Sequence, residues 1–216
     1  MPPRRKSTCT LELELQARAE GYKAVAGVDE AGRGCLFGPV YAAAVILDPE
    51  RPIAGLDDSK KLDAGVRDGL AVLIRERAVA WAVATATAAE IDRINILQAS
   101  RLAMRRAVEG LAVAADYLLV DATAVALPLA QKNVIHGDAL SQSIAAASIL
   151  AKTSRDALLA ELDAKYPGYE LASNKGYPAP AHLRGLDLLG PTEEHRMTYA
   201  PVRERAQRAL FAGARR

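Results

Sequence analysis

Short apolar runs that end in carboxylates constrain this chain more than any other feature. Residues 24–30 form one such run and end in Asp29-Glu30, and residues 117–120 lead directly into Asp121. Runs of this length, bounded by turn-forming residues, are typical of buried β-strands. A carboxylate at the end of a buried strand is unfavourable unless it is paired or bound to a metal. The sequence therefore predicts a sheet that brings several acids to one site.

The order of apolar patterns predicts an α/β fold. Strands are expected at residues 24–30, 39–47, 79–87, 117–121 and 132–135, and helices at 61–77, 96–114, 139–165, 181–189 and 202–211. A hairpin comes first, then helices and strands alternate, and only helices follow. This order indicates a mixed five-stranded sheet flanked by helices, with a small helical C-terminal subdomain. We expect an N-terminal extension (1–20), a core (21–166) and the helical part (167–216), with 21–212 together forming one domain.

Composition excludes several classes of protein. Cys9 and Cys35 have no CxxC spacing and the histidines do not cluster, so we expect neither a zinc site nor a disulfide framework. No apolar run approaches the ~20 residues of a membrane span. The basic start, residues 1–6, is not followed by an apolar segment, so no signal peptide is expected and a cytoplasmic location is favoured. Local clusters of lysine and arginine suit a phosphate backbone, but equally suit solvated helix faces.

The acids at the strand ends have the chemistry of a divalent metal site. Mg²⁺ and Mn²⁺ take oxygen ligands, and two such ions can support phosphodiester cleavage. For any one acid the simpler alternative is that it caps a turn or meets an arginine; for all three together we favour the metal site. Asp29 and Glu30 are adjacent, and neighbours on a regular strand point to opposite faces. We therefore expect the strand to distort or end at these two residues.

Seven ordered sequence blocks make the interpretation more specific. They begin with Gly27-Val28-Asp29-Glu30-Ala31-Gly32-Arg33-Gly34, followed by Gly38-Pro39-Val40, and continue with residues 57–62, Val120-Asp121, residues 146–156, residues 174–178 and residues 192–196. The set resembles the ribonuclease HII (type 2 ribonuclease H) family and covers nearly the whole chain. The chain departs from that pattern at Cys35, Phe37, Ala122 and Asn174.

The resemblance implies a ribonuclease H-like fold and a centre of four carboxylates and two metal ions. Asp29, Glu30 and Asp121 match the acids of the sheet, and Asp156 matches an acid on a helix. The implied activity is endonucleolytic hydrolysis of the RNA strand of RNA–DNA hybrids, and cleavage 5′ of ribonucleotides embedded in duplex DNA, leaving 5′-phosphate and 3′-hydroxyl ends. Two Mg²⁺ or Mn²⁺ ions would be the cofactors, and ribonucleotide excision repair the setting.

The resemblance also implies how the substrate is read. The loop Gly32-Arg33-Gly34 would contact the 2′-hydroxyl that distinguishes RNA from DNA, and Tyr177 would stack on the next sugar and favour an RNA-to-DNA junction. Cations expected to contact phosphates are Lys60, Lys61 and Lys152. Taken without the motif, the glycines indicate only a tight turn, Tyr177 a surface aromatic, and Lys152 with Asp156 an i,i+4 ion pair.

Two rival functions and one further partner remain at this stage. A junction resolvase or strand transferase would not need a 2′-hydroxyl, and a non-catalytic hybrid-binding protein would not need the acids. Gln207–Phe211 resembles the short peptide by which bacterial replication and repair proteins bind the sliding clamp. The alternative, which we favour, is that this segment is one face of a closing helix. We expect a monomer.

Overall fold

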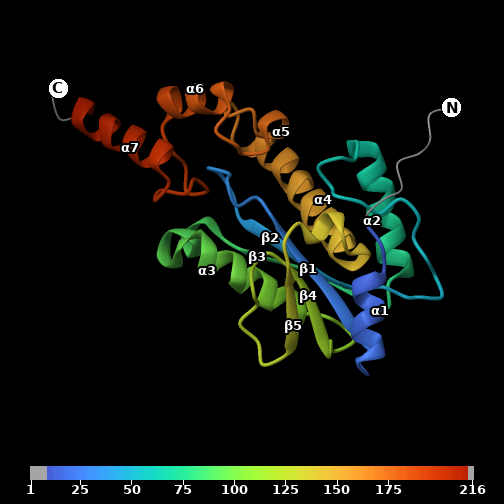
Figure 1. The fold of residues 1–216 in the computed structure, drawn as a ribbon. Coiled ribbons are helices and arrows are strands. Elements are labelled where there is room, and N and C mark those ends of the chain that lie inside the picture. Colours follow the sequence, from blue (N-terminus) through green and yellow to red (C-terminus); the bar gives the residue numbers. More distant parts are fainter. Residues whose placement is uncertain (1–8, 214–216) are drawn as a thin grey trace. The chain divides into compact units, whose positions relative to one another are not determined.

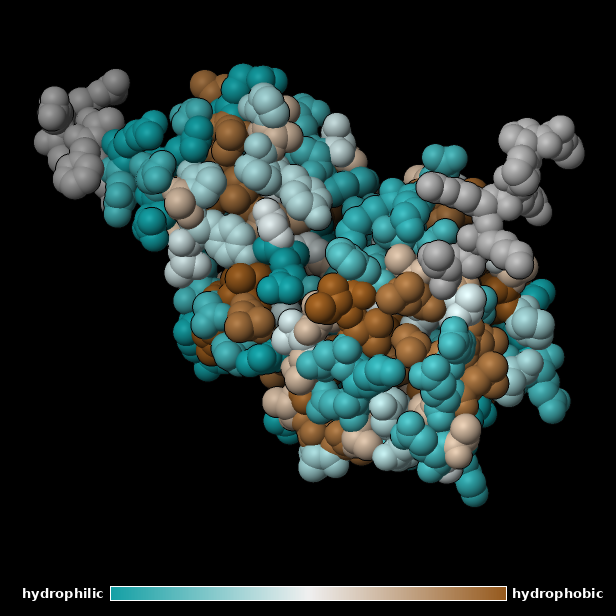
Figure 2. All heavy atoms as spheres, viewed as in Figure 1, coloured by the Kyte–Doolittle hydropathy of each residue, from teal (hydrophilic) through white to brown (hydrophobic). Residues whose placement is uncertain are grey.

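The computed structural model describes residues 9–213, and side chains as far as Arg208. The chain divides into two compact units, which are described separately. The first comprises Met1–Ala31, Tyr41–Thr85 and Arg101–Thr153; the second comprises Gly32–Val40, Ala86–Ser100 and Ser154–Arg216. No described helix is long and apolar enough to cross a membrane. Hydrophilic and apolar residues are interspersed on the face shown in Figure 2.

The first unit is built on the mixed five-stranded sheet that the sequence predicts (Figure 1). Its strands are β1 (Val25–Ala31), β2 (Val40–Ile46), β3 (Ala80–Ala86), β4 (Tyr117–Asp121) and β5 (Ala130–Val134), in the order β3-β2-β1-β4-β5. β1 pairs antiparallel with β2 and parallel with β4, and β4 pairs parallel with β5. The central position of β1 explains its apolar sequence, because both of its faces are covered.

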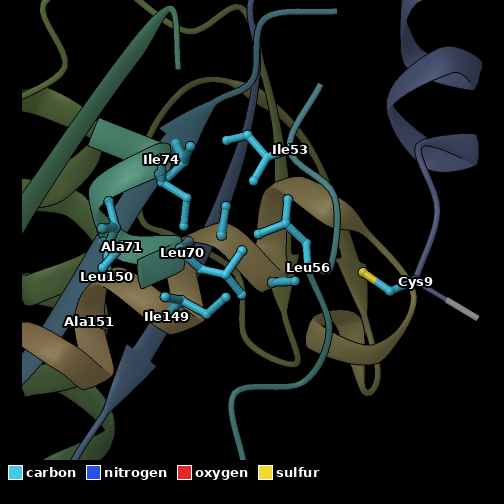
Figure 3. Packing of buried hydrophobic residues seen from close by; sticks show 14 residues of the cluster. Cys9, Ile53, Leu56, Leu70, Ala71, Ile74, Ile149, Leu150 and Ala151 are labelled. Carbon is cyan, nitrogen blue, oxygen red and sulfur yellow. The ribbon is translucent and has the colours of Figure 1, made fainter. Parts of the chain in front are cut away.

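Helices cover the sheet through closely packed small and aliphatic residues. α2 (Ala64–Arg77) and the part of α4 (Gln142–Lys165) that belongs to the first unit share an apolar cluster with β2. Figure 3 shows Leu70 and Ile74 of α2 near Ile149 and Leu150 of α4. At Gly27 of β1 an added Cβ would lie 2.1 Å from the backbone carbon of Ser143, so only glycine permits this approach of strand and helix.

Helix α1 (Glu12–Ala19) was not predicted from the sequence, and it packs beside β1 and β4 through Ala17. Glu14 is buried, and its Oε1 accepts hydrogen bonds from Ser141 Oγ at 2.6 Å and from the Ser143 N–H at 2.8 Å. A carboxylate is favourable at this place, because the first N–H groups of a helix have no partner within it. α1 thus caps the start of α4.

The helix expected at residues 96–114 begins earlier in the structure than predicted and also ends earlier. α3 runs from Ala88 to Glu109 and contains Asn95 with a positive φ of 66°. A reciprocal cap between Thr87 and Glu90 begins it, and the Asn95 side chain caps a second segment by accepting from the N–H of Gln98. The expected start at Ile96 is therefore the start of this second segment.

The second unit contains the C-terminal helices and part of α3 and α4. They are α5 (Leu171–Asn174), α6 (Pro180–Leu189) and α7 (Ala200–Gly213). Its core joins Leu36 and Phe37 from the glycine-rich loop to Leu159 of α4, Leu186 of α6 and Val202 of α7. The glycine-rich loop is therefore anchored in the hydrophobic core of the second unit.

Candidate active site

Asp29 and Glu30 lie in the last three residues of β1. Pairing with β2 is regular through this segment, with Asp29 opposite Ala43, Glu30 opposite Ala42 and Ala31 opposite Tyr41. The expectation that the strand ends at the two acids is therefore wrong, because its hydrogen-bonded register continues to Ala31. Asp29 is buried and Glu30 only partly so, and the two side chains leave the strand on opposite faces.

The buried Asp29 carboxylate is in an unfavourable electrostatic environment. Burial, and then the charges of Glu30 and Asp121, raise its pKa well above the ordinary range. Hydrogen bonds from Ser148 and from the backbone N–H of Glu30, the latter 2.7 Å long, act in the opposite direction without cancelling the effect. The carboxylates of Glu30 and Asp121 are thus close enough to disfavour the charge of Asp29.

Asp121 ends β4 and is joined to the 3-10 helix η1 (Gly137–Ala139). The Gly137 N–H donates to Asp121 Oδ1 at 2.8 Å. The next residue, Asp138, is buried, and its pKa is raised by burial and by the charges of Asp58 and Asp121, although Lys60 lowers it. The structure therefore adds a fourth acid to this site that the sequence reasoning did not select.

The lysines expected to contact phosphates differ in their surroundings. Lys60 Nζ lies 3.3 Å from Asp138 Oδ2, while most of the Lys60 side chain is exposed. Lys61 is exposed and pairs with Asp57 and Asp58 at 3.5 and 3.8 Å. Lys152 is partly buried on α4. Lys60 therefore contacts Asp138, an acid of the site.

The side chains of this site have the right chemistry for a hard divalent ion, but their oxygens are not arranged as a complete coordination shell. The acids Asp29, Glu30, Asp121 and Asp138 offer only oxygen ligands, which Mg²⁺ and Mn²⁺ prefer. Within the described residues no three acidic, histidine or cysteine side chains are already arranged to hold an ion. Side-chain rotation is therefore needed to bring their oxygens together, and a cation would offset both the burial and the repulsion that raise the pKa of Asp29.

In the second unit the glycine-rich loop and Tyr177 lie side by side. A Cβ placed on Gly34 would be 3.7 Å from Cε1 of Tyr177, and the Leu36 N–H donates to the Gly176 carbonyl at 2.7 Å. Gly34 and Tyr177 are exposed, and the latter's side chain is available for stacking. The two elements that the resemblance assigns to substrate reading thus form one surface.

Two buried arginines hold this surface in place. Arg155 donates from Nη1 to the Lys175 carbonyl at 2.8 Å and from Nη2 to the Phe37 carbonyl at 3.0 Å. Arg196 donates from Nη1 to the carbonyl of Arg33 and from Nε to that of Gly38, each at 2.9 Å. Gly32 has φ of 93°, and a Cβ there would meet the Arg155 guanidinium. Glycine is therefore required at residue 32, because of the positive φ and because a side chain would clash with Arg155.

Two departures from the family pattern in the loop point inward. Cys35 and Phe37 are fully buried, and the Phe37 ring lies edge-on to His195 with centroids 4.8 Å apart. Phe37 therefore belongs to the core beneath the loop, whereas Cys35 also forms a side-chain hydrogen bond with Tyr177 on the exposed side. A third departure, Ala122, follows Asp121 with φ of 54°, a conformation that favours glycine.

Asp156 stands on the part of α4 that belongs to the second unit and is partly buried. Its place among the metal ligands stays a prediction of the resemblance.

Sequence reasoning missed Asp138, Arg155 and Arg196 as site residues. A signal existed for each: Asp138 follows a glycine at the entry to a helix, and both arginines lie inside the quoted motif blocks.

Comparison with known proteins identifies the family of this chain. A family model described as Ribonuclease HII matches residues 26–202. The ribonuclease HII of Solibacter usitatus (strain Ellin6076) is 53% identical over 203 residues, covering 94% of this chain and 89% of its own length. That of Caulobacter vibrioides (strain NA1000 / CB15N) is 52% identical, covering 99% and 98%.

Solved structures share the fold. Ribonuclease H2 from Pyrococcus horikoshii OT3 matches with a TM-score of 0.72 and 27% identity, covering 86% of this chain and 98% of that one. Bst-RNase HIII in complex with Mn²⁺ matches with a TM-score of 0.63 over 94% of this chain and 74% of that one, and at 20% identity it supports the fold alone.

The sheet and its flanking helices are those of a ribonuclease H fold, and the chain is a hydrolytic ribonuclease. It belongs to the ribonuclease HII family, endonucleases that degrade the RNA of RNA–DNA hybrids and use divalent metal ions.

Proposed function

We propose that this enzyme also cuts 5′ of single ribonucleotides embedded in duplex DNA, using two divalent ions, and leaves 5′-phosphate and 3′-hydroxyl ends. The observation that carries the proposal is the buried Asp29, whose charge is opposed by Glu30 and Asp121. Such a cluster of carboxylates lowers the stability of the metal-free protein. A bound cation would therefore stabilise it strongly. When bound, the ions supply an activated water and stabilise the departing oxygen.

The chain's own residues have three tasks in this proposal. Asp29, Glu30 and Asp121 hold the ions, and the burial of Asp29 together with the partial burial of Glu30 and Asp121 limits competition from water. Lys60, Lys61 and Lys152 contact phosphates and fix the register without reading the sequence. Backbone groups of the loop from Gly32 to Gly34, with Arg33 between them, contact the 2′-hydroxyl, while Tyr177 stacks on the following sugar.

The fourth acid has two candidates, and we propose Asp138 as well as the sequence-based Asp156. Asp138 is supported by its burial, by its interaction with Asp121 and by the Gly137 contact with that residue. Asp156 is supported by the motif alone. The two assignments differ in which substitution removes activity.

The test measures cleavage and binding separately. Asp121→Asn is expected to abolish cleavage while substrate binding survives, because charge stabilisation is lost and the groove is kept. Asp138→Asn should lower kcat by about 100-fold or more if it holds a metal, and Asp156→Asn should do so if it does. Asp58→Asn is the matched control, since Asp58 also lies near Asp138 but pairs with Lys61. Wild-type turnover by the Asp121 variant would refute the assignment.

The substrates distinguish the rival functions. A duplex with one embedded ribonucleotide should be cut with Mg²⁺ or Mn²⁺, and its all-DNA counterpart should not. Cleavage of the all-DNA duplex would indicate a resolvase or transferase, and binding of hybrid without cleavage would indicate a non-catalytic protein. Tyr177→Ala should reduce activity on junction substrates about tenfold more than on uniform hybrids, as the loss of one stacking contact implies.

Docking to a sliding clamp through Gln207–Phe211 is a further proposal. One solved structure of this fold, matching with a TM-score of 0.66 and 23% identity, is of an Archaeoglobus fulgidus PCNA:RNase HII complex. In this chain α7 is helical through the segment, and the side chains of residues 209–213 lie outside the described ones. Replacing Leu210 and Phe211 by alanine should remove clamp binding without changing the melting temperature. A loss of several degrees would instead identify a packed helix.

A further inference from the structure

A buried pair of histidines lies beneath the surface formed by Tyr177 and the glycine-rich loop. His182 of α6 and His195 are both almost inaccessible, with their Nε2 atoms 3.2 Å apart. The rings of Phe37 and Tyr169 pack around them. Burial lowers the pKa of both histidines, that of His195 to about 3, so both are neutral near pH 7.

The outer nitrogens of the pair bind backbone groups of fixed polarity. His195 Nδ1 lies 3.0 Å from the backbone nitrogen of Thr192, and an N–H can only donate. The Thr192 hydroxyl lies 3.0 Å from the same Nδ1. At the other end, His182 Nδ1 lies 2.9 Å from the Tyr177 carbonyl, which can only accept.

These two ends specify the same arrangement of protons. A neutral imidazole has one donor and one acceptor. Because Nδ1 of His195 accepts, its proton is on Nε2, which donates to His182 Nε2. Because Nε2 of His182 accepts, its proton is on Nδ1, which donates to the Tyr177 carbonyl. The tautomers deduced from either end agree, so every nitrogen of the pair has a suitable partner.

We propose that His182 and His195 form a one-directional hydrogen-bond relay that holds the Tyr177 backbone and thereby sets the enzyme's preference for RNA-to-DNA junctions. Both are positioning residues, since neither reaches the solvent-exposed face of Tyr177. The proposal rests on the stacking role proposed above for Tyr177. The physical reason for its effect is that a side chain can stack on a sugar only if its own backbone is held at a fixed angle.

Two substitutions at His182 separate the two ends of the relay. An asparagine amide nitrogen can occupy the place of Nδ1 and still donate to the Tyr177 carbonyl. A glutamine amide reaches the place of Nε2 and contacts His195 instead. His182→Gln should therefore lower the ratio of kcat/KM on junction substrates to that on uniform hybrids by about five- to tenfold. His182→Asn is the matched control and should keep most of the ratio.

A measurement on the unaltered protein tests the relay without relying on activity. Long-range ¹H–¹⁵N NMR spectra at pH 7 should show His182 protonated on Nδ1 and His195 on Nε2, with the exposed His136 as the internal reference. Finding either buried histidine in the other tautomer, or charged, would overturn the relay.

The outcomes separate the relay from the role of Tyr177. A wild-type ratio in His182→Gln, or an equal fall in both His182 variants, would overturn the proposal if Tyr177→Ala lowers the ratio. An unchanged ratio in Tyr177→Ala would show that Tyr177 does not select junctions, and would remove the link to specificity whatever the tautomers are.

Discussion

Lowering the pH should destabilise this protein through His195. Burial, and then the neighbouring His182, depress the pKa of His195 from 6.5 to about 3. Between these values the unfolded chain binds a proton that the folded protein does not, so the free energy of unfolding rises with pH. The stabilising contribution is complete above about pH 6.5 and is lost as the pH falls toward 3. His182, whose pKa is also lowered, acts in the same direction.

The magnitude follows from the size of the shift. Each pKa unit corresponds to about 1.4 kcal/mol. Between pH 7 and pH 5 the His195 contribution to the free energy of unfolding should therefore fall by about 2 kcal/mol. The raised pKa of Asp29 has the opposite sign, because the folded protein then binds the extra proton and gains stability as the pH falls. A comparison of variants is therefore needed to isolate the histidine.

Urea unfolding at pH 7 and pH 5 provides the assay. His195→Gln has a neutral side chain at both values, so its loss of stability between them should be about 2 kcal/mol smaller than that of the wild type. His136→Gln changes an exposed histidine and should keep the wild-type loss. An equal loss in wild type and His195→Gln would refute the buried, neutral state of His195.

Three further substitutions test the geometry around the site. Ala122→Gly should raise the free energy of unfolding by about 1 kcal/mol, because the residue has φ of 54°; no gain would mean that this conformation is not strained. Gly27→Ala should cost about 1–3 kcal/mol or more, since its Cβ would meet the Ser143 backbone, and a neutral change in melting temperature would contradict that contact. Arg155→Lys should lower the melting temperature by several degrees, because one ammonium cannot reach the carbonyls that the guanidinium serves; unchanged stability would argue against those bonds.

Local pattern was sufficient to predict the strands and the acids that they contain. β4 has the expected bounds, 117–121, because a short apolar run ending in a charge is readable without knowledge of distant residues. The α/β order and the mixed five-stranded sheet are confirmed for the same reason. Helix boundaries were less predictable, as α3 shows: its start depends on a cap at Thr87 and its interruption on a single Asn95.

Tertiary structure alone decided which residues meet. Asp138 joins Asp121 because a backbone N–H of η1 binds that carboxylate across 16 residues of sequence. The loop at residues 32–38 and the segment at 175–177 are held together by the buried guanidinium group of Arg155, which donates to backbone carbonyls. Every residue has a backbone carbonyl, so the sequence does not indicate which ones an arginine will bind. The histidine pair likewise became evident only when two rings 13 residues apart were brought within hydrogen-bonding distance. The sequence determined the fold class and the chemistry of the acids, since both depend on residue type and period; the partners of each side chain depend on the packing of the whole chain.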